Sequence, residues 1–186
     1  MARAGKAAPG DENLPAAPRL VWRIVAARHA ERVWSGEGAR RWGGRWNPPG
    51  VAVVYASSTL SLAALELLVH LDPDLLPINL VAVAAELPSD PPLPTLRLRR
   101  LPAGWRTYPA PEFLQELGAE WVRTAGSLAL AVPSAVIPSE WNVLLNPAHP
   151  DFSRLRMHPA EPFAFDSRPL RETGPFRTKR KQRAGK

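Results

Sequence analysis

The chain has 186 residues, of which 45% are hydrophobic, and it contains no cysteine. This length and apolar content predict one domain with a substantial core. The lack of cysteine excludes disulfides, thiolate metal sites and a cysteine nucleophile. The formal net charge is +7, but residues 167–186 alone carry eight Arg or Lys and one Glu, so residues 1–166 hold 16 basic and 16 acidic side chains.

Both ends of the chain have the composition of disordered segments. Residues 1–18 are rich in Ala, Pro and Gly and lack the apolar run of a signal peptide, and no apolar stretch reaches the length needed to span a bilayer. We therefore expect a cytoplasmic protein with no membrane contact. The basic tail, 167–186, is expected to be solvated and disordered, with phosphate binding as the alternative. The folded domain is then 19–166.

The first half of this domain predicts two strands around a glycine-rich loop, followed by a helix. LVWRIV, Leu20 to Val25, has a strand composition. The stretch EGARRWGGRWNPPG, residues 37–50, suits neither a helix nor a strand, so we expect a loop. VAVVYAS, residues 51–57, predicts a strand buried on both faces. Ser58 or Thr59 is a good N-cap for a helix that continues to about Leu71, before Pro73.

The second half predicts more strands than helices. Residues 78–88 read as a strand, and the proline-rich connection after them holds a short strand at 95–99. Residues 109–126 predict an amphipathic helix, with Pro at its start and Gly at its end. A strand ending near Val132, a second short apolar run and one or two final strands complete the domain. The pattern predicts a single α+β domain with a curved mixed sheet and flanking helices.

The glycine-rich loop is the first candidate site. Gly43 and Gly44 allow close backbone approach, so their N–H groups are able to cradle a phosphate. Arg45 adds a bidentate anion contact, while Trp46 and Asn47 add a flat surface and an amide. The alternative is a tight turn between strands with its tryptophans in the core. The sequence contains neither a P-loop nor a GxGxxG motif.

Three further residues stand out against their surroundings. Arg23 interrupts an apolar strand, on the opposite face from Trp22 and Ile24, and either reaches water at a sheet edge or lines a polar site. Glu66 is the only acid in a helix that is apolar from residue 60 to 69, and it lies either on the solvent face or in a buried site. Ser134 follows a strand end as a turn residue or a site residue. The four histidines lack metal-ligand spacing, so no metal is expected.

Taken together, these segments resemble the RES-domain family, which is named for an Arg, a Glu and a Ser in this order. The matching stretches are VWRIV, GEGARRWGGRWNPPGVAVVYAS, LAALELLVH and VPSAVIPSEWNVLLNPAHPDF, and the resemblance runs from about Leu20 to Phe165. It implies an ADP-ribosyltransferase-like fold and a toxin of a bacterial type II toxin–antitoxin pair. The implied partner is an Xre-like antitoxin, in an oligomeric complex. The implied activity is hydrolysis or phosphorolysis of the nicotinamide–ribose bond of NAD+.

The resemblance also implies roles for individual residues. Glu66 would stabilise the ribosyl cation, Arg23 and Arg45 would hold the two phosphates, and Ser134 would bond ribose or nicotinamide. Tyr55 would border the nicotinamide ring. The loop residues that would close over the dinucleotide are Gly43, Gly44, Trp46 and Asn47. NAD+ is then a substrate, and no cofactor is expected. One departure is Ile24, where many family members have tyrosine, so the ring contact rests on Tyr55.

Two other functions stay open at this point. The first is a protein ADP-ribosyltransferase, which breaks the same bond but transfers to a protein acceptor. The second is a non-catalytic protein that binds nucleic acid through the basic tail. The toxin interpretation predicts no direct nucleic-acid binding except through the antitoxin. It also predicts that a segment of the antitoxin inserts near Arg23 and Arg45.

Overall fold

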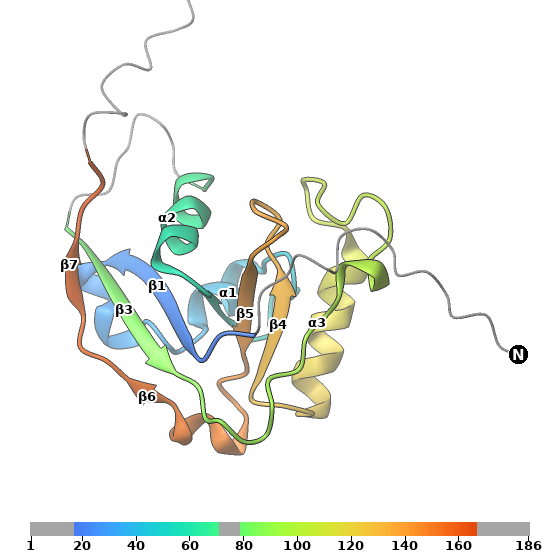
Figure 1. Ribbon diagram of the computed structural model, residues 1–186. Coiled ribbons are helices and arrows are strands. Elements are labelled where there is room, and N and C mark those ends of the chain that lie inside the picture. Colours follow the sequence, from blue (N-terminus) through green and yellow to red (C-terminus); the bar gives the residue numbers. More distant parts are fainter. Residues whose placement is uncertain (1–16, 71–78, 167–186) are drawn as a thin grey trace, which may run out of the picture.

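The computed structural model describes residues 17–70 and 79–166, whose strands form one seven-stranded sheet (Figure 1). The sheet order is β4-β5-β2-β1-β3-β6, with β7 also paired to β3. The strands are β1 Leu20–Ala26, β2 Val54–Ser57, β3 Leu80–Glu86, β4 Ala129–Pro133, β5 Trp141–Leu145, β6 Arg156–Met157 and β7 Glu161–Phe163. Every ladder between these strands is antiparallel. The expected mixed character is limited to one parallel bridge, Thr95 to Ala131.

In the described part of the chain, three α-helices flank the sheet: α1 Glu37–Trp42, α2 Leu60–Leu68 and α3 Glu112–Thr124. Short 3-10 helices add η1 Ala27–Arg32, η2 Leu98–Arg100 and η3 Pro150–Arg154. The predicted N-cap of α2 is confirmed, because the Thr59 hydroxyl accepts the Leu62 N–H at 3.0 Å. Helix α3 begins after Pro111 and ends at Ala125, which adopts a left-handed φ of 46°.

Two local predictions were wrong. Residues 37–50 contain helix α1, where a loop was expected. Gly36 and Gly43, with φ of 69° and 72°, bound this helix instead of breaking it, and Glu37 forms ion pairs along it with Arg40 and Arg41. The strand expected at 95–99 consists of a single bridge at Thr95 followed by η2. The prolines before Thr95 lack the N–H groups that a ladder needs.

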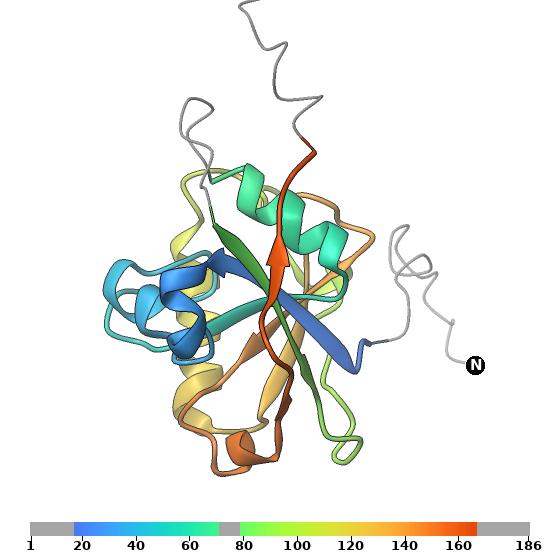
Figure 2. The same cartoon turned by 90° about the vertical axis from the view of Figure 1, so that its left-hand side faces the viewer.

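The two faces of the sheet pack differently, since side chains alternate along each strand. One face carries a large apolar cluster that includes Val21, Val54 and Val143. The opposite face carries two separate clusters, one beneath α2 and the other beside α3. Figure 2 shows α2 crossing above β1 and β3, on the side of the sheet away from η1. This divided face leaves room for polar residues between its two apolar clusters.

Residues 1–16, 71–78 and 167–186 lie outside the described residues, so the predictions about the N-terminal segment and the basic tail stay predictions. Within 17–70 and 79–166, no helix combines the length and apolarity needed to cross a bilayer.

Candidate functional site

A polar pair interrupts the row of residues that crosses the middle of the sheet. Along this row the backbone register joins Ala84 to Trp22, Trp22 to Ser57, Ser57 to Asn142 and Asn142 to Val132. All five side chains share one face, because paired residues project to the same side. The Ser57 hydroxyl donates to Asn142 Oδ1 at 2.9 Å, which fixes the orientation of the Asn142 amide. Ser57 and Asn142 therefore form the floor of a polar site between the two apolar clusters.

Glu66 reaches this site from α2. Its Oε1 accepts the Ser134 hydroxyl at 2.6 Å and the Asn142 Nδ2 at 2.5 Å. No residue in the described ranges hydrogen-bonds to Oε2, so one carboxylate oxygen is fixed and the other is available to a ligand. Of the two interpretations that the sequence left open, the structure selects the half-buried site over the solvent face.

Ser134 orients Glu66 through a turn between β4 and β5. Its side chain is fully buried, and its Oγ accepts the N–H groups of Val136 at 3.0 Å and Ile137 at 2.9 Å. Two backbone donors occupy the oxygen lone pairs, so the hydroxyl proton points to Glu66. Ser134 then has neither a free lone pair nor a free proton for a substrate. The geometry therefore favours a role for Ser134 in positioning Glu66 over the expected contact with ribose or nicotinamide.

Tyr55 lies two residues before Ser57 on the same face of β2 and forms a wall of the site. Its hydroxyl donates to Asn47 Oδ1 at 2.6 Å and accepts the Trp46 N–H at 2.9 Å, and burial raises the pKa of this phenol. Asn47 is buried and its Nδ2 donates to the carbonyls of Ala39, Pro48 and Val51. The Tyr55 hydroxyl is therefore held by one donated and one accepted bond, and its half-buried ring is the part that we expect to meet a ligand.

The expected roles of the glycine-rich loop need correction. The Gly43 N–H donates to the Ala39 carbonyl and the Gly44 N–H donates to the Asn47 carbonyl, each at 2.8 Å, so neither amide can cradle a phosphate. A Cβ on Gly44 would lie 2.6 Å from the Tyr55 hydroxyl, and this close approach is what requires glycine there. Trp46 is 2% exposed whereas Trp42 is 84% exposed. Gly43, Gly44, Trp46 and Asn47 thus support the site from behind.

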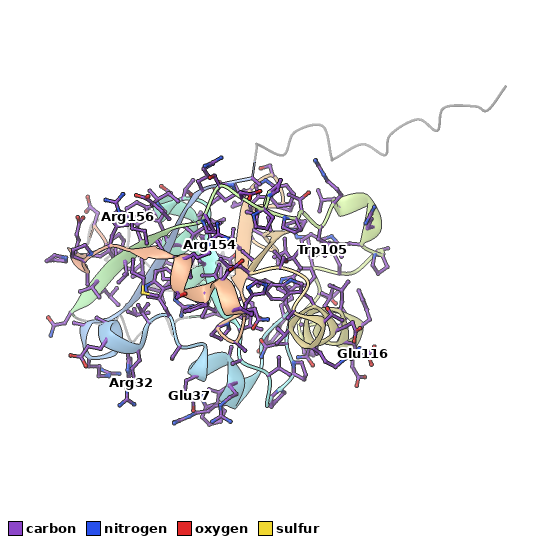
Figure 3. The ribbon with its side chains drawn as sticks, turned by 90° about the horizontal axis from the view of Figure 1, so that it is seen from below. Arg32, Glu37, Trp105, Glu116, Arg154 and Arg156 are labelled. Atoms are coloured by element: carbon purple, nitrogen blue, oxygen red, sulfur yellow. The ribbon has the colours of Figure 1, made fainter. Side chains whose placement is uncertain are left out.

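Arg45 is the loop residue that faces the site. Its Nη1 donates to the carbonyls of Trp105 at 2.7 Å and Thr107 at 3.2 Å, so the loop before α3 holds it in place. Trp105 itself is buried, beside α3 (Figure 3). Partial burial lowers the pKa of Arg45, and the nearby Glu66 carboxylate opposes this effect. The predicted anion-binding guanidinium is thus present without a carboxylate bonded to it.

Arg23 meets the site through the backbone of Tyr55. Its Nη1 donates to the Tyr55 carbonyl at 2.7 Å, while its Nε is buried and has no hydrogen-bond partner. Burial lowers the pKa of Arg23 to about 10. Arg23 is therefore not an edge residue in water. Ile24 packs beneath α2 against Ala63, in the apolar cluster there.

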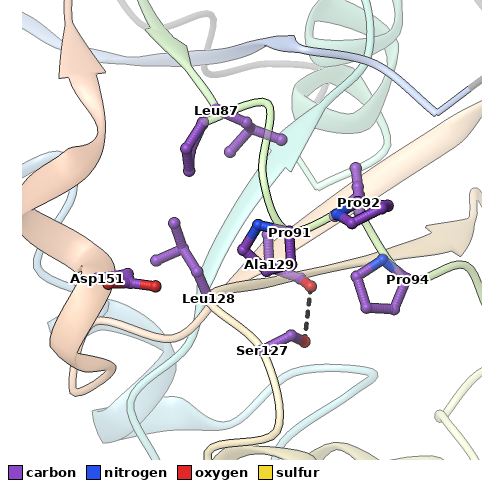
Figure 4. Close-up of a pocket in the computed structure, with 10 residues that line it drawn as sticks. Leu87, Pro91, Pro92, Pro94, Ser127, Leu128, Ala129 and Asp151 are labelled. Atoms are coloured by element: carbon purple, nitrogen blue, oxygen red, sulfur yellow. Dashed lines mark hydrogen bonds between the residues drawn. The ribbon is translucent and has the colours of Figure 1, made fainter.

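The three elements that supply the site meet at one end of the sheet. Figure 1 shows α2, the turn between β4 and β5, and the loop before α3 together at this end. A separate apolar hollow lies near the other end of β4, and its walls include Leu87, Pro91, Leu128 and Asp151 (Figure 4). Its polar side chains are Asp151 and Ser127, and the Ser127 hydroxyl is bonded to the Ala129 carbonyl, so that hollow lacks the groups for catalysis. The described residues contain no group of three or more acids or histidines that suits a metal ion.

The comparison with protein families decides the identity. The RES domain model matches residues 20–166. The chain belongs to the RES-domain family. Among curated relatives of this RES-domain protein, "Toxin Res" of Yersinia enterocolitica is 39% identical over 153 residues, covering 80% of this chain and 98% of the relative. A second relative, "Prs ADP-ribosylating toxin" of Sphingobium sp., is 38% identical over 156 residues, covering 81% and 96%.

A solved structure supports the fold of this RES domain. A chain of the M. tuberculosis MbcT–MbcA toxin–antitoxin complex matches with a TM-score of 0.56 and 15% identity, covering 80% of this chain and 86% of that one. The expected α+β domain with a curved sheet and flanking helices is confirmed. Sequence reasoning missed two site residues, Asn142 and Ser57. The signal was an asparagine in the otherwise apolar strand WNVLL, and a serine that ends VAVVYAS.

Proposed function

We propose that this RES-domain protein is the toxin of a toxin–antitoxin pair and that it cleaves the nicotinamide–ribose bond of NAD+. The observation that carries the proposal is the Glu66 carboxylate, which two donors fix at Oε1, while Oε2 accepts no hydrogen bond from the described residues and Arg45 is near enough to feel the charge. The relatives named "Toxin Res" support the toxin role. The MbcT–MbcA complex supports an antitoxin partner, which we take to be of the Xre type.

The chemistry of this bond suits a fixed carboxylate. When the bond between C1′ and the pyridinium nitrogen breaks, its electron pair leaves with nicotinamide, which departs neutral and needs no strong acid. The ribose becomes an oxocarbenium-like cation, and a nearby negative charge stabilises it. The oxygen of a water or phosphate then bonds to C1′, and a water nucleophile releases its proton to Glu66 or to solvent. The products of hydrolysis are nicotinamide, ADP-ribose and a proton.

The remaining residues bind and position the substrate in this proposal. Arg45 binds the phosphates of the substrate, and Arg23, which donates to the Tyr55 carbonyl, holds the backbone of β2 behind the site. The half-buried ring of Tyr55 borders nicotinamide. Ser134 and Asn142 do not touch the substrate and keep Glu66 in place.

The test is cellular NAD+ after brief induction in a bacterial host. The variants are wild type, Glu66→Gln, and Glu116→Gln as a matched control on the exposed face of α3 (Figure 3). We expect rapid NAD+ loss with wild type and with the control, and none with Glu66→Gln. Equal NAD+ loss in all three would refute the role of Glu66. Growth arrest at constant NAD+ would refute NAD+ depletion.

A second candidate is ADP-ribosylation of a protein, which the name of the Sphingobium relative favours. The same bond breaks, but an acceptor side chain attacks C1′ in place of water. Mass spectrometry of host proteins after induction distinguishes the two, because only this activity attaches ADP-ribose to a protein. For both candidate functions we expect the antitoxin to inhibit the protein by inserting a segment near Arg23 and Arg45. A purified antitoxin complex that still cleaves NAD+ at the free rate would argue against it.

A further inference from the structure

The loop before α3 carries a second arginine beside Arg45. Arg106 donates from its Nε to the Ala135 carbonyl at 2.8 Å, one residue after Ser134. Arg45 in turn donates from Nη1 to the carbonyls of Trp105 and Thr107, on both sides of Arg106, and from Nη2 to the carbonyl of Arg106 itself at 3.5 Å. The two guanidinium groups are close enough for the positive charge of Arg106 to act on Arg45. The loop thus holds two like charges near each other at the site.

This arrangement differs from an ordinary solvated arginine. An unrestrained arginine side chain would turn away from a neighbouring positive charge, but the bond to Ala135 prevents this. Both Nη groups of Arg106 make no hydrogen bond or ion pair within the described ranges. No acid forms an ion pair with Arg45 or Arg106 among the described residues. Two anchored guanidinium groups with no acid bonded to either of them form a cradle for two adjacent phosphate groups.

We propose that Arg106 is a specificity-determining residue that, together with Arg45, selects a substrate with a diphosphate over one with a single phosphate. This inference rests on the proposed function, since it places the reacting ribose at Glu66 and the diphosphate beyond it. Both arginines are placed around the carboxylate: Glu66 lies near Arg45, and Arg106 is bonded to the carbonyl of the residue after Ser134, which itself bonds Glu66. A nicotinamide dinucleotide carries its positive charge on the nicotinamide ring, and its ribose becomes cationic as the bond breaks, with two anionic phosphates beyond it, so a carboxylate beside two arginines matches this distribution of charge.

The test compares binding of ADP-ribose and of ribose 5-phosphate by calorimetry. The variants are wild type, Arg106→Ala, Arg106→Lys, and Arg100→Ala as a control that removes an exposed arginine from the same connection. We expect Arg106→Ala to weaken ADP-ribose binding about 10- to 100-fold, the usual value of a hydrogen bond to a charged group. Binding of ribose 5-phosphate should stay near wild type, and Arg106→Lys should restore part of the loss.

The outcomes separate this inference from the proposed reaction. If Arg106→Ala binds ADP-ribose as Arg100→Ala does, or if wild type binds no ADP-ribose, the inference is overturned. An equal loss for both ligands would show a structural role and overturn it as well. In NAD+ cleavage we expect Arg106→Ala to raise KM with kcat nearly unchanged. A wild type that binds ADP-ribose through Arg106 but does not cleave NAD+ would refute the reaction while supporting the diphosphate site.

Discussion

Replacing Asn142 tests whether the fixed orientation of Glu66 matters for the reaction. Asn142→Ala removes one of the two donors at Oε1 and leaves the Ser57 hydroxyl without its acceptor. Losing a donor makes a carboxylate more basic, which favours contact with a cation, but it also frees the side chain to rotate. A misplacement of about 1 Å slows a reaction roughly 100-fold, so the loss of the fixed position should outweigh the stronger attraction to the cation. A bond to a charged group is worth about 1.5–3 kcal/mol, and we expect kcat to fall about 10- to 100-fold.

Asn146 provides the matched control for this prediction. It is also a buried asparagine, whose Nδ2 donates to the Val122 carbonyl at 3.3 Å and whose Oδ1 accepts the Ala148 N–H at 3.0 Å. Asn146→Ala should therefore cost similar stability, about 1 kcal/mol for each lost bond, without a change in kcat. The assay is the initial rate of nicotinamide release by purified protein, together with Tm. Equal kcat losses in both variants would refute the reasoning, because they would show general destabilisation.

Asn142→Asp sharpens the same test, because it keeps the shape of the side chain and exchanges its donor for an acid. Two carboxylates 2.5 Å apart cannot both ionise at neutral pH. We expect activity to fall at least as far as in Asn142→Ala and the acid limb of the pH–rate profile to move to higher pH. A profile identical to wild type would contradict the contact between Asn142 and Glu66.

Three further predictions concern stability. Burial lowers the pKa of Arg23 to about 10, which means that burying its charge costs the folded state roughly 3 kcal/mol. Its one hydrogen bond returns about 1 kcal/mol. Arg23→Met should therefore raise Tm by several degrees and reduce activity. The cost of burying this charge applies at every pH below about 10 and is relieved above it, because Arg23 releases its proton in the folded state before it does so in the unfolded state. A lower Tm for Arg23→Met than for wild type at neutral pH would contradict the prediction. Gly118→Ala places a Cβ on the Trp46 carbonyl oxygen and should cost about 1–3 kcal/mol in urea unfolding, while Gly126→Ala, whose Cβ would lie 3.9 Å from the Thr124 hydroxyl, an ordinary contact, should have little effect. Two arginines lower the pKa of Glu37 from 4.5 to about 2, so its contribution is present above pH 4.5 and is lost as the pH falls towards 2. Unfolding of Glu37→Gln should depend less on pH in this range, and an unchanged dependence would refute the effect.

The sequence by itself determined most of the local elements and the three motif residues. Thr59 marks the start of α2 because a hydroxyl before an apolar run satisfies the first N–H groups of a helix. Arg23, Glu66 and Ser134 stood out because each is a polar residue at a position where its surroundings predict burial or a strand end. Their order in the chain was enough to indicate the RES-domain family, which the family comparison confirmed.

Only the tertiary structure decided which polar atoms are free to bind a substrate. Ser134 and Asn142 are 68 and 76 residues from Glu66 in the chain, and no local pattern reports contacts at that separation. The amides of Gly43 and Gly44 looked available in the sequence, yet carbonyls of the same loop and of α1 occupy them. Donors and acceptors that are buried must pair somewhere, and the fold determines with which partner. Within the described part of the site, Glu66 Oε2 and the Nη groups of Arg106 are among the polar atoms that this pairing leaves without a partner.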